Sequence, residues 1–231
     1  MAQEPSARVC GLIMEKFLTF FVVLIGWVFS LTLHEFMHAF VAYQGGDWTV
    51  REKGYLTFNP LKYTHPLYSI AIPLLFLLLG GIGLPGGAVY IQTHLLRSDR
   101  WRSAVALAGP LSNLFLAIVL GLLLRFAPLT DSGLWPGLAF LALLQVTAAL
   151  FNLLPIAPFD GYNAIRPYLG WQVRERMDQF GQVSLIVIFL AFSYLPLVST
   201  LFWGLVRLVA TLTGVPLFLA ALGQSQFMFW R

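Results

Sequence analysis

The chain has 231 residues, of which 58% are hydrophobic and only 10% are charged, with a formal net charge of +4. Together with a mean hydropathy of +0.78, this composition excludes an ordinary soluble domain and predicts an integral membrane protein in contact with the lipid bilayer. The apolar runs are continuous, which favours helical spans over the alternating strands of a barrel. The basic residues cluster in a few loops and are explained by membrane topology, so we expect no nucleic-acid partner.

The first predicted span runs from about Phe17 to Tyr43 and follows a tail over residues 1–16. The apolar run continues into a polar motif, so we expect a retained span and not a cleaved signal peptide. A polar segment, Trp48 to Thr64, comes next. Within it, the alternation over residues 55–58 predicts a short strand.

The segment from Pro66 to Leu84 is apolar but short for a span, and Pro73 interrupts it. We expect it to be re-entrant or to lie along the membrane interface. The residues from Ala88 to Ile91 then predict a second short strand.

Two more core spans are predicted, from about Ser103 to Arg125 and from about Gly137 to Leu154. A polar segment over 162–182 is expected in the cytoplasm. The remaining region, 183–231, is long enough for one or two further spans, with a break near Pro196. The sequence therefore predicts an all-α polytopic membrane protein with a three-span core over residues 17–161. Arg207 in the last region has no explanation in the sequence.

The first span carries the motif His34-Glu35-Phe36-Met37-His38. Residues four apart project from one face of a helix, so His34 and His38 can bind one Zn²⁺, and Glu35 can act on a metal-bound water. Ionisable groups at membrane depth cost about 2.5–3.5 kcal/mol each on insertion scales, so they are kept for function. The motif also occurs by chance in soluble helices, but this apolar chain has only four histidines, and a metal site is favoured.

A catalytic zinc needs a third protein ligand and an open fourth position. Asp160 is the strongest candidate because it follows a span and the helix-breaking residues Pro155 and Pro158. Its alternative role is that of a turn residue at a helix end. His65 and His94 lie in polar segments, and we interpret them as loop residues.

The position of Asp160 constrains the topology. If Asp160 joins the zinc near the end of the first span, the third span must end on that same side, and the chain between residues 43 and 102 must leave and return to it. That side then receives nine basic residues, and the other side receives three. The nine are Arg51, Lys53, Lys62, Arg97, Arg100, Arg102, Arg166, Arg174 and Arg176. Such a bias predicts an active site near the cytoplasmic side and an external N-terminus.

Three motifs, in this order and at these spacings, resemble those of the site-2 protease family of intramembrane zinc metalloproteases. They are His34-Glu35-Phe36-Met37-His38, Gly109-Pro110-Leu111-Ser112-Asn113, and Asn152-Leu153-Leu154-Pro155 leading to Asp160-Gly161. The resemblance covers roughly residues 31–161. It implies a prokaryotic, multi-pass endopeptidase of the cell membrane that cuts membrane-protein substrates in or near their transmembrane helices.

The resemblance also assigns roles to residues. It implies that His34, His38 and Asp160 are the zinc ligands and that Glu35 is catalytic. Asn113 and Asn152 are expected to hold the substrate backbone or the oxyanion, with interhelical packing as their alternative role. The strands near Tyr55 and Val89 are expected to pair with an unwound substrate.

The chain departs from many members of that family. The turn from Pro128 to Pro136 is too short for a PDZ domain, and we expect no soluble regulatory domain after Leu222. We therefore expect substrates to be selected in the membrane, by the re-entrant segment, or by an accessory or adaptor protein.

Two other functions stay open. The first is a zinc-binding scaffold or transporter without hydrolysis. It would need ionisable groups along a path through the bilayer, and apart from Arg207 the other spans lack them. The second is an adaptor that binds transmembrane helices, which would have no use for Glu35.

Overall fold

The computed structural model describes residues 5–59, 62, 75, 77–78, 89–126 and 133–230. Within these residues the chain is helical with irregular connections, and it forms no strand. Four helices are long and apolar enough to cross a membrane, or up to five if a bent C-terminal pair forms one span. They are α1 (Pro5–Gly45), α4 (Asp99–Leu124), α5 (Leu134–Asn152) and α7 (Trp171–Tyr194). The prediction of an all-α polytopic membrane protein is confirmed.

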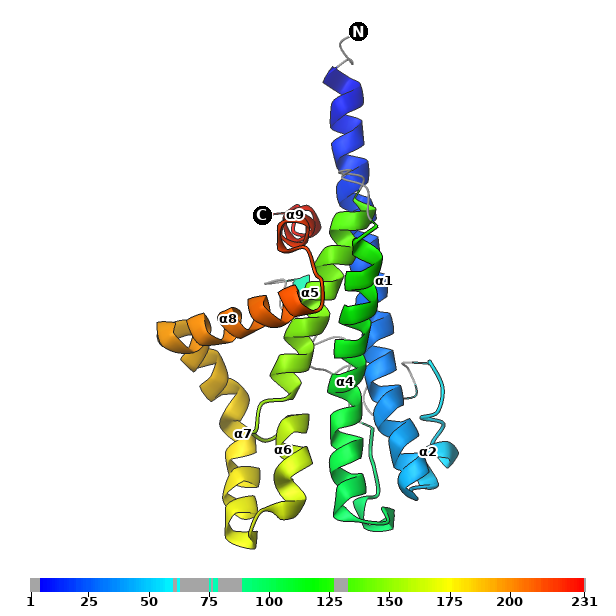
Figure 1. The fold of residues 1–231 in the computed structure, drawn as a ribbon, viewed down its shortest axis with the longest axis vertical. Helices are drawn as coiled ribbons and strands as arrows, with labels where there is room; N and C mark the ends of the chain where they lie inside the picture. The colour runs from blue at the N-terminus through cyan, green and yellow to red at the C-terminus, as the bar shows by residue number, and fades with distance from the viewer. Residues whose placement is uncertain are drawn as a thin grey trace.

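Helices α1, α4 and α5 lie side by side and form the centre of the molecule (Figure 1). The buried faces of α4 and α5 are rich in small residues, including Ala106, Ala117, Ala142 and Ala148. Small residues let membrane helices approach closely, and packing then holds the bundle together. Helix α5 is the most enclosed, with 72% of its most apolar stretch buried, whereas α7 has 6% buried and packs at the periphery.

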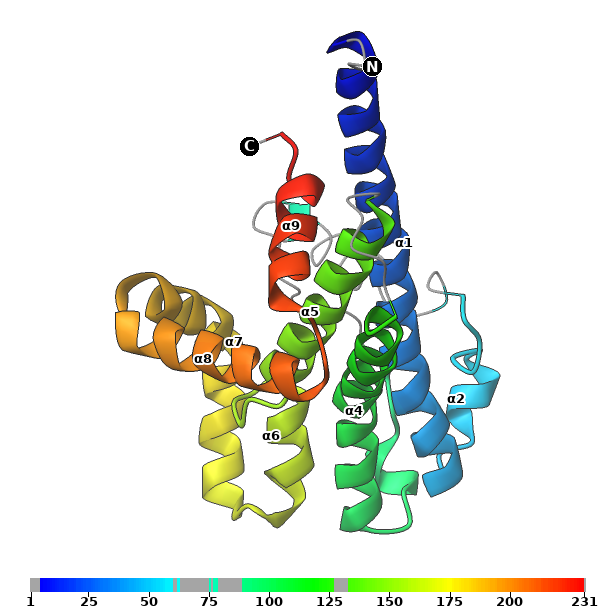
Figure 2. The same ribbon diagram turned by 45° about the horizontal axis from the view of Figure 1, so that its top comes forward.

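The C-terminal region forms α7, α8 (Pro196–Leu212) and α9 (Leu217–Phe227). Because α7 ends at Tyr194 and Pro196 begins α8, the predicted break is confirmed. Helices α8 and α9 meet at a bend of 116°, which Figure 2 shows clearly. Arg207 lies on the exposed side of α8, and nothing in the structure explains it.

The predicted strand near Tyr55 is wrong. Residues 55–58 instead form an irregular bend after a short helix, α2 (Thr49–Glu52). The Gly54 N–H donates to the Arg51 carbonyl and the Tyr55 N–H to the Val50 carbonyl, both at 3.0 Å. These two bonds form a helix C-cap, so the backbone N–H of Tyr55 serves α2 and not a sheet. The Tyr55 side chain is buried in a small apolar cluster.

The second predicted strand is also wrong over residues 89–91, the part of it that the structure describes. Val89 to Gln92 is an irregular segment that joins no sheet within the described residues. Its N–H groups donate to two side-chain carboxylates: Val89 to Glu35 Oε2 at 3.1 Å and Gln92 to Asp47 Oδ2 at 2.7 Å. These acceptors take the place of a partner strand. The predicted re-entrant segment, 66–84, lies largely outside the described residues, although Leu77 is buried in the main core.

Candidate metal centre

The two histidines of α1 and the carboxylate of Asp160 converge on one point. His34 and His38 are buried, one helical turn apart, with their Nε2 atoms separated by 3.1 Å. Asp160 Oδ2 lies 3.3 Å from Nε2 of His34 and 3.4 Å from Nε2 of His38. Among the described residues, these three side chains form a group that could hold a metal ion.

The remaining ring nitrogens have partners of their own. His38 Nδ1 lies 2.7 Å from the Val105 carbonyl, and His34 Nδ1 lies 2.6 Å from Oδ1 of Asn113. Both partners accept hydrogen bonds, so both Nδ1 atoms carry hydrogens. In neutral rings, two Nε2 lone pairs and a carboxylate oxygen then face one another. Such an arrangement needs a cation at its centre, and a metal ion serves all three atoms at once.

The separations of these atoms fit zinc. Tetrahedral zinc with bonds of about 2.0–2.1 Å keeps its ligand atoms roughly 3.3 Å apart. The observed separations are 3.1 to 3.4 Å. Burial raises the pKa of Asp160, but positive charge on the rings of His38 and His34 lowers that pKa below the usual aspartate range, so a cation at this point, proton or metal, keeps the carboxylate ionised. The donor set is two imidazoles and one carboxylate, which is typical of catalytic zinc with a fourth position open for water.

Two glycines allow this convergence. A methyl group on Gly109 would collide with the Nε2 atoms of His34 and His38, because the backbone of α4 runs directly against both rings. A methyl group on Gly161 would collide with the Leu153 carbonyl at the end of α5. Gly161 therefore lets α6 (Asp160–Ile165) start close to α5, which brings Asp160 to the histidines.

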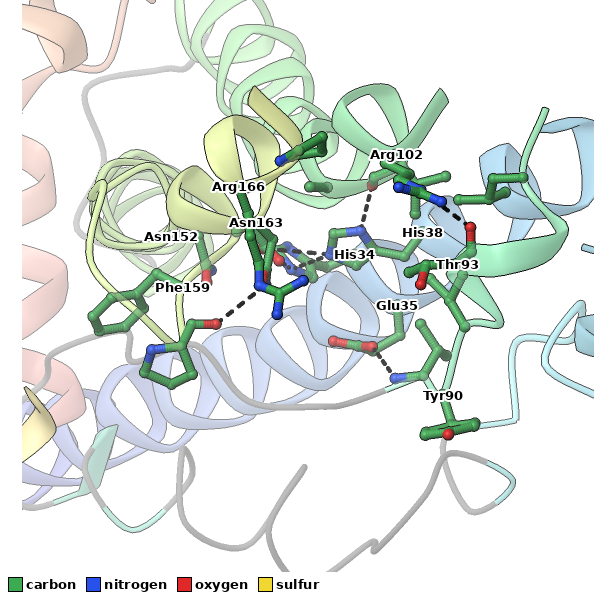
Figure 3. Close-up of a pocket in the computed structure, with 18 of the residues that line it drawn as sticks. His34, Glu35, His38, Tyr90, Thr93, Arg102, Asn152, Phe159, Asn163 and Arg166 are labelled. Carbon is green, nitrogen blue, oxygen red and sulfur yellow. Dashed lines mark hydrogen bonds and ion pairs between the residues drawn. The ribbon is translucent and has the colours of Figure 1, made fainter. Parts of the chain in front are cut away.

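A cavity of about 650 Å³ opens onto the three potential ligands. Figure 3 shows His34, Glu35 and His38 along one wall. Glu35 is buried, and its carboxylate accepts the hydrogen bond from the Val89 backbone. The cavity thus contains both a metal-binding group and a carboxylate suited to proton transfer.

The other predicted site residues differ in their positions. Asn152 lines the cavity, whereas Asn113 lies behind His34 and is absent from the described lining. Val89 lines the cavity and Tyr55 does not. His94 is exposed in the short helix η3 (Thr93–Leu95), outside the described lining, and His65 lies outside the described residues.

Some residues at the site were not predicted from the sequence. The Asn113 amide donates to the Gln145 side-chain oxygen, and the Gln145 amide donates to the Ser30 hydroxyl. An isolated amide such as Gln145 within an apolar span is a signal that could have revealed it. The cavity lining also includes three basic side chains whose charge in the sequence indicates only membrane topology: Arg102, Arg166 and Arg174.

Comparison with known proteins supports the same site chemistry. The chain is 44% identical over 215 residues to "Putative zinc metalloprotease Rip2" of Mycolicibacterium smegmatis, covering 91% of this chain and 81% of that protein. The Rip2 protein of Mycobacterium tuberculosis is 46% identical over 216 residues, with the same coverage. "Putative zinc metalloprotease YwhC" of Bacillus subtilis is 33% identical over 189 residues, covering 78% of this chain and 83% of that protein.

The chain belongs to the site-2 protease family. It is a multi-pass membrane protein of prokaryotic type, and its three converging side chains fit the zinc ion after which these relatives are named. No family model and no solved structure matches the chain.

Proposed function

We propose that the protein is an intramembrane zinc endopeptidase that hydrolyses peptide bonds in or near the transmembrane helices of membrane proteins, as in regulated intramembrane proteolysis. One observation carries this proposal. Three converging acceptor atoms and the carboxylate of Glu35 share one cavity, and His34, Glu35 and His38 all come from a helix long and apolar enough to cross a membrane.

The proposed chemistry assigns separate tasks to the residues. His34, His38 and Asp160 would hold the zinc, which would supply Lewis acidity to a scissile carbonyl and to water. Glu35 takes a proton from the attacking water as the new C–O bond forms at the carbonyl carbon. It returns the proton to the leaving nitrogen as the C–N bond breaks, which yields a carboxylic acid and an amine.

Asn152 is well placed to assist this reaction. It is the last residue of α5, is buried, and lines the cavity close in sequence to Asp160. Its amide could donate to the developing oxyanion, a contribution worth about 10²–10³ in rate at comparable sites. For Asn113 this role stays a prediction, because both ends of its amide already bond to His34 and Gln145.

The substrate must present an extended segment, because a helix uses its peptide groups in its own hydrogen bonds. The segment from Val89 to Ile91 lines the cavity and could receive such a segment along its backbone. Pairing at Tyr55 stays a prediction. A separate proposal is that an accessory or adaptor protein presents the substrate, because the short α4–α5 connection has no room for a PDZ domain.

We also propose that the active site lies near the cytoplasmic side and that the N-terminus is external. The end of α1, the start of α4 and the short helix α6 all lie at the same end of the molecule (Figure 1). That end carries basic residues such as Arg51, Arg100 and Arg166, which favour a cytoplasmic location.

The proposal is tested by replacing the proton carrier alone. Cells that produce the wild-type protein, Glu35→Gln or the exposed control Glu52→Gln are compared by membrane proteomics with labelling of new N-termini. We expect fragments that begin within or beside transmembrane segments in the wild type and the control, and their loss in Glu35→Gln. Undiminished fragments in Glu35→Gln would favour a zinc-binding scaffold or transporter and would overturn the proposal.

A further inference from the structure

We propose that Asn113, Gln145 and Ser30 form a buried hydrogen-bond relay that orients His34 as a metal ligand, an inference that rests on the zinc site proposed above. The relay links all three core helices. Ser30 lies on α1, Asn113 on α4 and Gln145 on α5. Each of these side chains is at most 3% exposed, so water does not compete for their hydrogen bonds.

The relay has a fixed direction that begins at a main-chain carbonyl. The Ser30 hydroxyl donates to the Trp27 carbonyl at 2.8 Å, so its oxygen is left to accept from Gln145 Nε2 at 3.1 Å. The Gln145 oxygen must then face Asn113, and it accepts from Asn113 Nδ2 at 2.8 Å. The other end of the Asn113 amide, Oδ1, therefore faces His34.

The last link fixes the histidine. Asn113 Oδ1 lies 2.6 Å from Nδ1 of His34 and can only accept, so His34 must donate from Nδ1. Its Nε2 then points to Asp160 and His38 with a lone pair free for a metal. The Trp27 carbonyl therefore sets, through three side chains, which nitrogen of His34 can bind zinc.

The second histidine needs no such relay. His38 Nδ1 is held by the Val105 carbonyl, which no side-chain substitution removes. His34 is consequently the ligand whose orientation depends on side chains. Partners that orient metal-binding histidines typically contribute about 10–100-fold in metal affinity.

The test measures the zinc dissociation constant of the purified full chain in detergent, by competition with a chelator. Asn113→Leu removes the acceptor at similar volume, and we expect affinity to fall by about 10–100-fold. Asn113→Asp keeps an oxygen toward His34 and should restore most of the affinity. Gln145→Met, which breaks the second link, should weaken binding in the same direction.

Thr147→Val provides the matched control. Thr147 is a buried polar residue of α5, but its hydroxyl bonds to the Leu143 carbonyl of its own helix, outside the relay. We expect unchanged zinc affinity in this variant. Wild-type affinity in Asn113→Leu, or an equal loss in Thr147→Val, would overturn the relay.

The same variants separate the relay from the proposed function. Asn113→Leu with unchanged zinc affinity but a lower kcat at unchanged KM would assign Asn113 to the oxyanion and refute the relay. Weakened zinc binding that Asn113→Asp rescues would support the relay even if no variant, nor the wild type, cleaved a membrane protein.

Discussion

The backbone N–H of Val89 donates to Oε2 of Glu35 over 3.1 Å and so joins α1 to the segment that borders the cavity. The other end of that segment is held by Asp47, a buried residue whose Oδ2 accepts from the Gln92 N–H at 2.7 Å. The second carboxylate oxygen of Asp47 accepts from the Thr49 N–H and hydroxyl. Asp47 therefore positions the segment that contacts Glu35.

This arrangement predicts that Asp47→Ala impairs cleavage without removing zinc. The Gln92 N–H would lose its acceptor, at a cost of about 1–3 kcal/mol if it stays buried, and the segment over 89–92 would loosen. We expect a fall in kcat/KM of about tenfold or more, corresponding to about 1.4 kcal/mol, with wild-type zinc content. Asp47→Asn, which keeps one acceptor oxygen, should be intermediate. Equal kcat/KM in wild type and Asp47→Ala would contradict this role.

Gly109→Ala should abolish zinc binding, although alanine is the better helix former by about 0.8–1.0 kcal/mol. The added methyl group would collide with the ligand nitrogens of both histidines. The matched control is Gly204→Ala in α8, where the added methyl group meets open space. Metal analysis of both purified variants tests the point. Zinc retained in Gly109→Ala would show that α4 does not press against the ligands as described.

Removal of zinc should lower the unfolding temperature of the protein. Without the ion, two ring nitrogens and the Asp160 carboxylate oxygen face one another at 3.1 to 3.4 Å. A ligand that binds only the folded state at 100 times its dissociation constant stabilises by about 2.7 kcal/mol. Thermal unfolding in detergent, with and without a chelator, measures the difference. If the chelator lowered the unfolding temperature of Asp160→Ala as much as that of the wild type, the stabilising ion would have to bind elsewhere.

The three candidate ligands that the structure brings together could be predicted from the sequence because each has a local cause. The four-residue spacing of His34 and His38 places both on one helix face wherever the helix lies. Asp160 can be predicted because Pro155 and Pro158 end helical hydrogen bonding after the third span and leave a carboxylate in a non-helical break. Their convergence in the structure depends on Gly109 and Gly161, whose importance appears only once the helices are packed.

The strands could not be predicted correctly because an alternating pattern does not reveal the hydrogen-bond partner. Tyr55 belongs to an alternating pattern typical of a strand, but its N–H caps the C-terminus of α2. The sequence around Val89 is typical of a strand, but the Val89 N–H donates to the carboxylate of Glu35 on α1. The hydrogen bonds from Asn113 to Gln145 and from Gln145 to Ser30 could not be predicted for the same reason, since the three residues lie on different helices.

The proposed activity depends most on Asp160, which completes a zinc site with His34 and His38, and on Glu35, which acts there without being a ligand. The most direct measurement is the zinc-to-protein ratio of the purified wild type, Asp160→Ala and Glu35→Gln after the same mild chelator wash. We predict that Glu35→Gln retains zinc as the wild type does and that Asp160→Ala loses most of it. Full retention of zinc by Asp160→Ala, or an equal loss from Glu35→Gln, would contradict the account.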